Sequence, residues 1–249
     1  MNNKNDYDLL KGKNVLITGG TKGIGRATAI LLAKNQANVF IIGRDKKRID
    51  ETIKMVSKTP KTKVYGLAGD VSHEKFLISV FDFIDKKSGG LDILINNASL
   101  GARSILDQDM DKLEYFLKVN LESHMRCTRL ALDRMIPKNS GHIINIGSLS
   151  SVFFEKDADI YVSTKAAIAG FTKSIRKKVN EYSIKVSLIQ SGSVATSMVD
   201  EDENTKIKYV KNHIFLKPED IAELILFILI QPKRSDIMEV HIKPHKQFL

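Results

Sequence analysis

The stretch Thr18-Gly19-Gly20-Thr21-Lys22-Gly23-Ile24-Gly25 follows the short apolar run Asn14–Thr18 and leads directly into a helical pattern. A strand, a glycine-rich turn and a helix in this order are typical of a nucleotide-binding α/β unit. Glycines allow the backbone to approach a pyrophosphate closely, and a helix N-terminus directs free N–H groups at an anion. The spacing, T-G-x-x-x-G-x-G, differs from the standard G-x-G-x-x-G fingerprint, and a purely structural turn is the alternative.

The rest of the chain repeats this alternation of apolar, β-branched runs with helix-length amphipathic stretches. Such alternation predicts βαβ units. We expect an α/β fold, a Rossmann-like doubly wound parallel sheet of about seven strands with helices on both faces, in a single domain over residues 1–249. Strands are predicted at Asn14–Thr18, Asn38–Ile42, Lys63–Ala68, Asp92–Ile95, His142–Ile146, Lys185–Gln190 and Met238–Ile242. Helices are predicted at Gly23–Asn35, Lys46–Ser57, His73–Lys86, Lys112–Met135, Tyr161–Tyr182 and Pro218–Ile230.

Composition limits the class of protein. With 249 residues, 43% hydrophobic and 27% charged, the chain has the composition of a folded globular protein. Cys127 is the single cysteine, so a disulfide scaffold is excluded and a reducing compartment is favoured. Met1–Lys13 lacks the apolar run of a secretory signal, and Leu224–Ile230 is too short to span a bilayer, so we expect a cytoplasmic protein. The net charge of +10 leaves nucleic acid, an anionic surface and a phosphorylated small molecule as candidate partners.

The end of the second predicted strand bears on the cofactor. An NAD enzyme of this type usually places a carboxylate about 20 residues after the glycine turn, where it binds the ribose 2′-hydroxyl. Here Gly43 and Arg44 occupy that stretch, and a guanidinium can bind the 2′-phosphate of NADP in a fork. Lys22 adds a second positive charge, while Asp45 is expected to cap the next helix. These residues favour NADP(H), with solvent-facing basic residues as the alternative.

A second constellation lies further along the chain. Tyr161 and Lys165, at i and i+4 of a helical pattern, are predicted to share one helix face. A cation there stabilises a phenolate, and we expect it to lower the pKa of Tyr161 towards neutrality, which suits an acid that protonates an alkoxide. Ser148, at the end of an apolar strand, is expected to donate a hydrogen bond to the same oxygen. Because Y-x-x-x-K is common, a surface pair is the alternative.

With these residues the chain resembles the short-chain dehydrogenase/reductase family, in its short single-domain branch, from about Lys11 to Pro244. The matches occur in the family's order. After the glycine turn they are Gly69-Asp70-Val71, Asn96-Asn97-Ala98, Asn120, Ser148, Tyr161 and Lys165.

The resemblance implies four catalytic residues. Tyr161 transfers the proton, and Lys165 lowers its pKa and binds the nicotinamide ribose hydroxyls. Ser148 orients the substrate carbonyl, and Asn120 holds a water that relays protons.

The resemblance also implies contacts with the cofactor. Asp70 should contact the adenine amino group, Asn97 should lie along the cofactor, and Val194 and Thr196 should contact the carboxamide. The expected cofactor-binding residues are Gly19, Thr21, Lys22, Gly23, Ile24, Gly25, Arg44, Asp70, Val71, Asn97, Ala98, Tyr161, Lys165, Val194 and Thr196.

The predicted function is an NADP(H)-dependent oxidoreductase that acts on CH–OH groups, transferring a hydride between nicotinamide and a ketone or hydroxy-acid type of substrate. The ending Glu239–Pro244 is similar to that of NADP-dependent hydroxy-acid and carbonyl-reducing members. The enzymatic alternative is a 3-oxoacyl-[acyl-carrier-protein] reductase, for which a basic surface suits an acidic carrier protein. The non-enzymatic alternative is a dinucleotide-sensing or nucleic-acid-binding module.

We expect a small-molecule substrate and no nucleic-acid or membrane partner. The resemblance implies that the helices Lys112–Met135 and Tyr161–Tyr182 pack against their copies in a homodimer or homotetramer, although both could simply cover the sheet. No metal site is expected, because Pro244 separates His241 from His245 in a predicted strand and tail. Packing is the expected role of Cys127.

Three features depart from the family or from the α/β rhythm. Ser99 and Ser191 stand where the family has glycine and proline, which puts the path beside the nicotinamide and the stiffness of the following hinge in doubt. The polar segment of about residues 195–216 is interpreted as a lid over the site, with a solvated loop and surface helix as the alternative. The substrate pocket is expected to be shaped by Ser99–Ile105, Val152–Ile160 and Ser197–Phe215.

Overall fold

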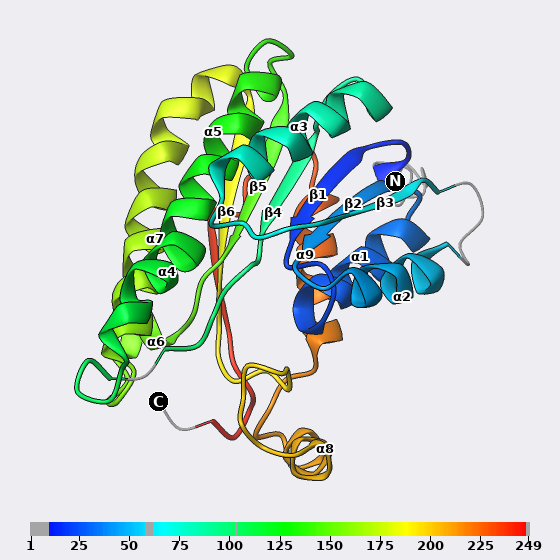
Figure 1. The fold of residues 1–249 in the computed structure, drawn as a ribbon. Helices are drawn as coiled ribbons and strands as arrows, with labels where there is room; N and C mark the ends of the chain where they lie inside the picture. The colour runs from blue at the N-terminus through cyan, green and yellow to red at the C-terminus, as the bar shows by residue number, and fades with distance from the viewer. Residues whose placement is uncertain (1–9, 58–61, 103, 248–249) are drawn as a thin grey trace.

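The computed structural model describes residues 10–57, 62–102 and 104–247. They form a seven-stranded parallel sheet in the order β3-β2-β1-β4-β5-β6-β7 (Figure 1). The strands are β1 (Asn14–Thr18), β2 (Asn38–Gly43), β3 (Val64–Ala68), β4 (Ile93–Asn96), β5 (Gly141–Ile146), β6 (Ile184–Ser191) and β7 (Glu239–Ile242). The predicted Rossmann-like parallel sheet is confirmed.

Helices cover both faces of the sheet (Figure 1). One layer consists of α1 (Gly23–Lys34), α2 (Lys46–Val56) and α9 (Pro218–Leu229). The other consists of α3 (Glu74–Ser88), α5 (Ser123–Met135) and α7 (Asp159–Val179). The two-sided cover explains the continuous apolar runs of the strands, because a parallel strand is buried on both faces.

Alternate residues along each strand pack into two separate hydrophobic cores. In β1, Val15 and Ile17 pack with the α1 and α9 layer, whereas Leu16 between them packs with α3 and α5. All three are fully buried. A one-residue shift in register would exchange these faces, so the hydrophobic pattern fixes the strand pairing.

The long helix predicted at Lys112–Met135 is interrupted. A 3-10 turn (η2, Met110–Lys112) and α4 (Leu113–Leu117) lead into a π-helical turn (η3, Lys118–Glu122) before α5 begins. Two further helices were not assigned individually from sequence: α6 (Ser150–Phe153), and α8 (Glu203–Lys211) inside the predicted lid. The predicted helix Tyr161–Tyr182 begins two residues earlier, at Asp159, and ends in a 3-10 turn (η4, Asn180–Tyr182).

The strand order reverses between β1 and β4, where the chain departs in opposite directions from neighbouring strands. In open α/β sheets, ligands bind in the crevice at this point, outside the carboxyl ends of the strands. The residues that follow β1, β4, β5 and β6 therefore meet at one edge of the sheet.

Candidate active site

A cavity of about 460 Å³ lies at this edge. It is lined by every predicted cofactor-binding residue except Gly25, namely Gly19, Thr21, Lys22, Gly23, Ile24, Arg44, Asp70, Val71, Asn97, Ala98, Tyr161, Lys165, Val194 and Thr196. Of the other predicted catalytic residues, Ser148 and Asn120 do not line the cavity. Their chain neighbours Gly147 and Val119 do line it.

The glycine turn is built for close backbone approach. Gly19 has a φ of +66°, and a Cβ there would lie 3.0 Å from the Ala98 Cα. A Cβ at Gly25 would lie 2.3 Å from the Gly19 carbonyl oxygen, so the absent side chain lets α1 seat against the turn. The Asn97 amide donates to the backbone oxygens of Thr18 (2.9 Å) and Gly19 (3.2 Å), which links the turn to the end of β4.

Helix α1 begins at this turn without a side-chain cap and without an acidic residue in its first turn. Its first N–H groups have no intrahelical acceptor, and the helix dipole adds partial positive charge. A free helix N-terminus beside a glycine cradle fits a pyrophosphate.

One end of the cavity is basic. Burial lowers the pKa of Lys22, and the neighbouring charges of Arg48 and Arg44 lower it further. Asp45 caps α2 by accepting from the Arg48 N–H (3.2 Å), as predicted. Arg48 was not among the residues predicted to bind the cofactor. Its exposed side chain pairs with Asp45 (3.3 Å), and its charge also acts on Lys22.

Sequence reasoning also missed Tyr115 in α4. Its hydroxyl donates to Asp70 Oδ2 (2.6 Å) and accepts from Arg44 Nη1 (2.8 Å). Burial raises the pKa of Asp70, but the hydrogen bonds from Tyr115 and the Ser72 N–H outweigh it, so the net pKa is lowered. The ends of β2 and β3 are thus joined through one phenol, and no motif around Tyr115 signals it because its partners are 45 and 71 residues away.

Tyr161 and Lys165 lie on the inner face of α7, as predicted. The Lys165 Nζ lies 5.5 Å from the centre of the Tyr161 ring and donates to the Ile146 carbonyl oxygen (2.9 Å). Burial lowers the pKa of Lys165 to about 8. The predicted lowering of the Tyr161 pKa is wrong for this structure: burial raises it to about 12, which the Ser148 hydrogen bond opposes and the Glu155 charge reinforces.

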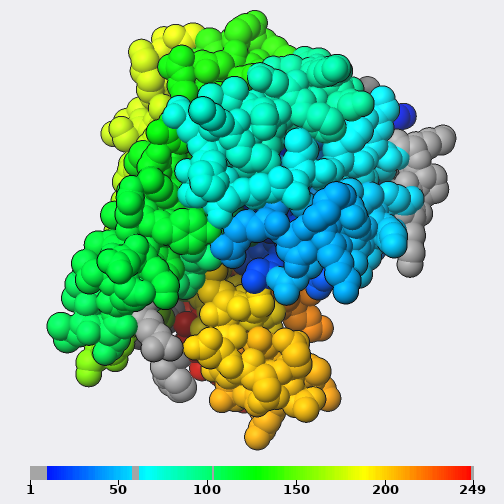
Figure 2. Space-filling view, in the orientation of Figure 1, coloured from blue at the N-terminus to red at the C-terminus, as the bar shows by residue number. Residues whose placement is uncertain are grey.

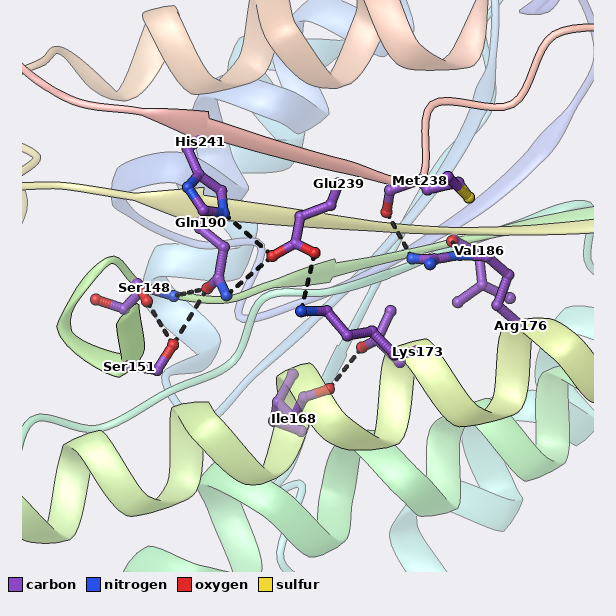
Figure 3. A network of polar contacts seen from close by, with 11 residues as sticks. Ser148, Ser151, Ile168, Lys173, Arg176, Val186, Gln190, Met238, Glu239 and His241 are labelled. Atoms are coloured by element: carbon purple, nitrogen blue, oxygen red, sulfur yellow. Dashed lines mark hydrogen bonds and ion pairs between the residues drawn. The ribbon is translucent and has the colours of Figure 1, made fainter. Parts of the chain in front are cut away.

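Ser148 follows β5 and is held by its backbone (Figure 3). Its N–H donates to Gln190 Oε1 (2.9 Å), and its carbonyl oxygen accepts from the Ser151 hydroxyl (2.7 Å). Gln190 Nε2 in turn donates to Glu239 on β7 (3.5 Å). Gly147 makes this possible, because a Cβ there would lie 2.3 Å from Gln190 Oε1. The serine is therefore oriented by Gln190 on β6, which Glu239 on β7 holds in turn.

Asn120 lies fully buried in the π-helical turn. Its Oδ1 accepts from the Leu100 N–H (2.7 Å) and its Nδ2 donates to the Leu100 oxygen (2.8 Å). Both amide atoms are thus occupied in tying η3 to the segment after β4. Single π-helical turns are frequent at functional sites because they shift the backbone hydrogen-bonding pattern.

The remaining predicted features are placed as follows. Val194 and Thr196 follow β6, and the Thr196 methyl would lie 3.0 Å from a Cβ at Gly23. Cys127 is buried in α5, and burial raises its pKa to about 12. Among the described residues, no group of His, Cys, Asp and Glu side chains could hold a metal ion. No helix in the same part of the chain is long and apolar enough to cross a membrane.

Residues 13–207 match the short chain dehydrogenase family. The chain belongs to the short-chain dehydrogenase family. An uncharacterized oxidoreductase of Staphylococcus aureus (strain USA300) is 31% identical over 237 residues, which cover 95% of this chain and 99% of the relative.

Two solved structures extend this likeness to the fold. A metagenomic short-chain oxidoreductase in complex with NADP has a TM-score of 0.83 and 24% identity, covering 96% of this chain and 100% of the other. The L-sorbose reductase of Gluconobacter frateurii, complexed with NADPH and L-sorbose, has a TM-score of 0.85 and 24% identity over 94% of this chain and 96% of the other. This short-chain dehydrogenase is accordingly an oxidoreductase by family and Rossmann-like by fold.

Proposed function

We propose that this short-chain dehydrogenase uses NADP(H) to interconvert a carbonyl group and a secondary alcohol. The observation that carries the proposal is one continuous cavity, with a glycine cradle and a basic cluster at one end and Tyr161 and Lys165 at the other. The distance between a dinucleotide's phosphates and its nicotinamide calls for such an elongated site.

The preference for NADP(H) rests on the basic end. The charges of Arg48 and Arg44 act on Lys22, and a polyanion placed beside these groups would relieve this repulsion. The 2′-phosphate of NADP has that charge, and the planar guanidinium of Arg44 suits it. Uncapped α1 and the Gly19 turn fit the pyrophosphate. The structural relatives named above that bind NADP or NADPH are in agreement by analogy.

Catalysis is assigned to the other end. When bound, the nicotinamide ring supplies or accepts the hydride. Tyr161 donates its phenol proton to the developing alkoxide, and its raised pKa keeps that proton in place at neutral pH. Ser148 hydrogen-bonds the same oxygen, and Lys165 adds positive charge beside the phenol and binds ribose hydroxyls. Asn120 holds the loop after β4 in register with these groups.

The test is a panel of NADPH-consumption assays with small ketones, 2-oxo and 3-oxo acids, and 3-oxoacyl thioesters, run beside NADP-dependent oxidation of secondary alcohols. We expect turnover of ketones or oxo acids, with Tyr161→Phe reduced by at least roughly a hundredfold. Activity on thioesters alone would favour a 3-oxoacyl-[acyl-carrier-protein] reductase. Salt-sensitive binding of nucleic acid with no turnover of any substrate would favour a binding module.

A further inference from the structure

A chain of hydroxyl groups leads away from Tyr161. The Ser148 hydroxyl hydrogen-bonds the Tyr161 phenol. It also donates to the Ser150 hydroxyl (2.9 Å), which donates to Glu155 Oε2 (2.7 Å). Phenol, two alcohols and a carboxylate therefore form one continuous hydrogen-bonded row.

This row runs from the interior of the site to solvent. Ser148 and Ser150 are each 7% exposed, whereas Glu155 is exposed. A hydroxyl can accept one hydrogen bond while donating another, so each serine can pass a proton along without a net change in charge. The carboxylate at the outer end exchanges protons with water.

The backbone around Glu155 is shaped for this contact. Phe154 and Asp157, on either side of it, have φ values of +56° and +66°. For a bulky side chain such as Phe154 the left-handed region is unfavourable and persists only where surrounding contacts hold it. The turn brings Glu155 back over α6, where it meets Ser150.

The other polar groups of the site make their hydrogen bonds elsewhere. The Lys165 ammonium donates to the Ile146 oxygen, and both amide atoms of Asn120 bond to Leu100. His124 on α5 is buried next to Lys165, and burial lowers its pKa to about 3, so it is neutral at ordinary pH. Among the described residues, the acidic side chain whose charge acts on Tyr161 is Glu155.

We propose that Ser150 and Glu155 form a proton relay that exchanges the Tyr161 proton with solvent through Ser148. The inference rests on the proposed carbonyl chemistry. After Tyr161 has given its proton to the substrate alkoxide, Ser148 gives its proton to the phenolate, Ser150 replaces the proton of Ser148, and protonated Glu155 replaces that of Ser150. At each step one O–H bond breaks and another forms. The relay ends with a neutral phenol and a Glu155 carboxylate, which regains its proton from water. During alcohol oxidation the protons move through the same groups in the opposite direction.

Glu155 also sets the direction in which the two serine hydroxyls donate their hydrogen bonds. As a carboxylate it draws both serine protons outward, as the structure has them. When Glu155 is protonated it can donate to Ser150, which frees the Ser148 proton to point at the phenol and the substrate oxygen. Protonation of Glu155 thus both supplies the proton and aligns the Ser148 hydroxyl.

The first test compares Ser150→Ala and Glu155→Gln with two matched controls. These are Asp157→Asn, two residues from Glu155, and Ser163→Ala, an exposed serine on α7. With the best carbonyl of the panel, both relay variants should lose kcat by roughly tenfold or more at alkaline pH, with KM little changed. Their solvent isotope effect should change, and a small ammonium buffer whose pKa lies near the assay pH should restore much of the rate. Relay variants that keep the wild-type kcat, pH profile and isotope effect would overturn the proposal.

The second test needs no substrate. Ultraviolet titration of the apo-protein, with Tyr161→Phe to identify the signal, should give a lower Tyr161 pKa in Glu155→Gln than in wild type, and no change in Asp157→Asn. An unchanged pKa in Glu155→Gln would overturn the connection. If wild type reduces no carbonyl and the pKa still moves, the proposed function fails while the link between Glu155 and Tyr161 stands.

Discussion

At the scale of single residues, the burial of Lys165 opposes folding, although its ammonium has a central chemical role. It is 1% exposed, its ammonium bonds to the Ile146 oxygen, and burial lowers its pKa from 10.5 to about 8. Burying a charge opposes folding, whereas a cation beside the phenol serves catalysis. Function and stability therefore make opposite demands at this position.

We expect Lys165→Met to abolish turnover and to increase the free energy of unfolding at neutral pH. Below pH 8 the lysine is charged in both states, and its lowered pKa corresponds to a penalty of roughly 3 kcal/mol in the folded state, offset by about 1 kcal/mol from the bond to Ile146. Between pH 8 and about 10 the unfolded chain binds more protons than the folded one, so wild-type stability rises with pH. The gap between variant and wild type should narrow over that window.

Urea unfolding of both proteins near neutral pH and near pH 10 measures this change. A variant that is less stable than wild type at neutral pH, or a gap that stays constant with pH, would contradict the prediction.

Tyr115 offers a second prediction at this scale. Because its phenol joins Arg44 to Asp70, Tyr115→Phe should leave both charges less well oriented towards the adenosine half of NADP(H). We expect the Kd for NADPH to rise by roughly threefold to tenfold, which corresponds to about 1 kcal/mol, the net value of one ordinary hydrogen bond. The chain has no tryptophan, so the fluorescence of NADPH itself reports binding. Tyr182→Phe, at the opposite end of β6, should bind as wild type does.

At the scale of elements, strands were easier to predict than helix irregularities. Each observed strand end lies within one residue of its prediction because runs such as His142–Ile146 are buried on both faces and their composition marks them directly. The π-helical turn Lys118–Glu122 could not be predicted. Its position depends on the bonds between Asn120 and Leu100, which helical periodicity does not reveal.

The same limit applies to the site. The sequence analysis could find Ser148, Tyr161 and Lys165 because their spacing and their places in predicted elements form a recognisable motif. Their partners Tyr115 and Gln190 did not, because each acts through a contact formed only when distant segments fold together.

The ends of β5 and β6 and the first residue of β7 form one positioning unit around Ser148 (Figure 3). Gln190 holds the serine N–H, and Glu239 holds Gln190 while pairing with Lys173 on α7 (3.1 Å). In Gln190→Met a buried N–H of Ser148 loses its acceptor, which should cost about 1–3 kcal/mol of stability and lower kcat without raising the Kd for NADPH. Gln231→Met, on the surface beyond α9, is the matched control. Unchanged stability in Gln190→Met would refute this role.

At the scale of the whole molecule, the predicted lid is a closed loop. Its two ends are joined by a bridge between Val194 and Leu216, with the Leu216 N–H donating to the Ser193 oxygen (2.9 Å). Within it, the rings of Tyr209 and Phe215 pack edge to face at 5.1 Å. In the space-filling view this segment, yellow to orange, borders the blue residues of the N-terminal half (Figure 2).

The lid reaches the cavity through Met198, whose Cγ would lie 3.7 Å from a Cβ at Gly101 across the opening. A cofactor filling the cavity would contact this stretch and favour the closed position, so NADPH should slow tryptic cleavage at the exposed Lys208 and Lys211 of α8. If cleavage requires local opening, saturation at 100 times the Kd allows protection of up to about a hundredfold. Cleavage at Lys86, at the far end of α3, should not change. Equal protection at both places would mean that NADPH stabilises the molecule as a whole, and no protection at saturation would mean that the segment is a solvated loop that does not close on the site.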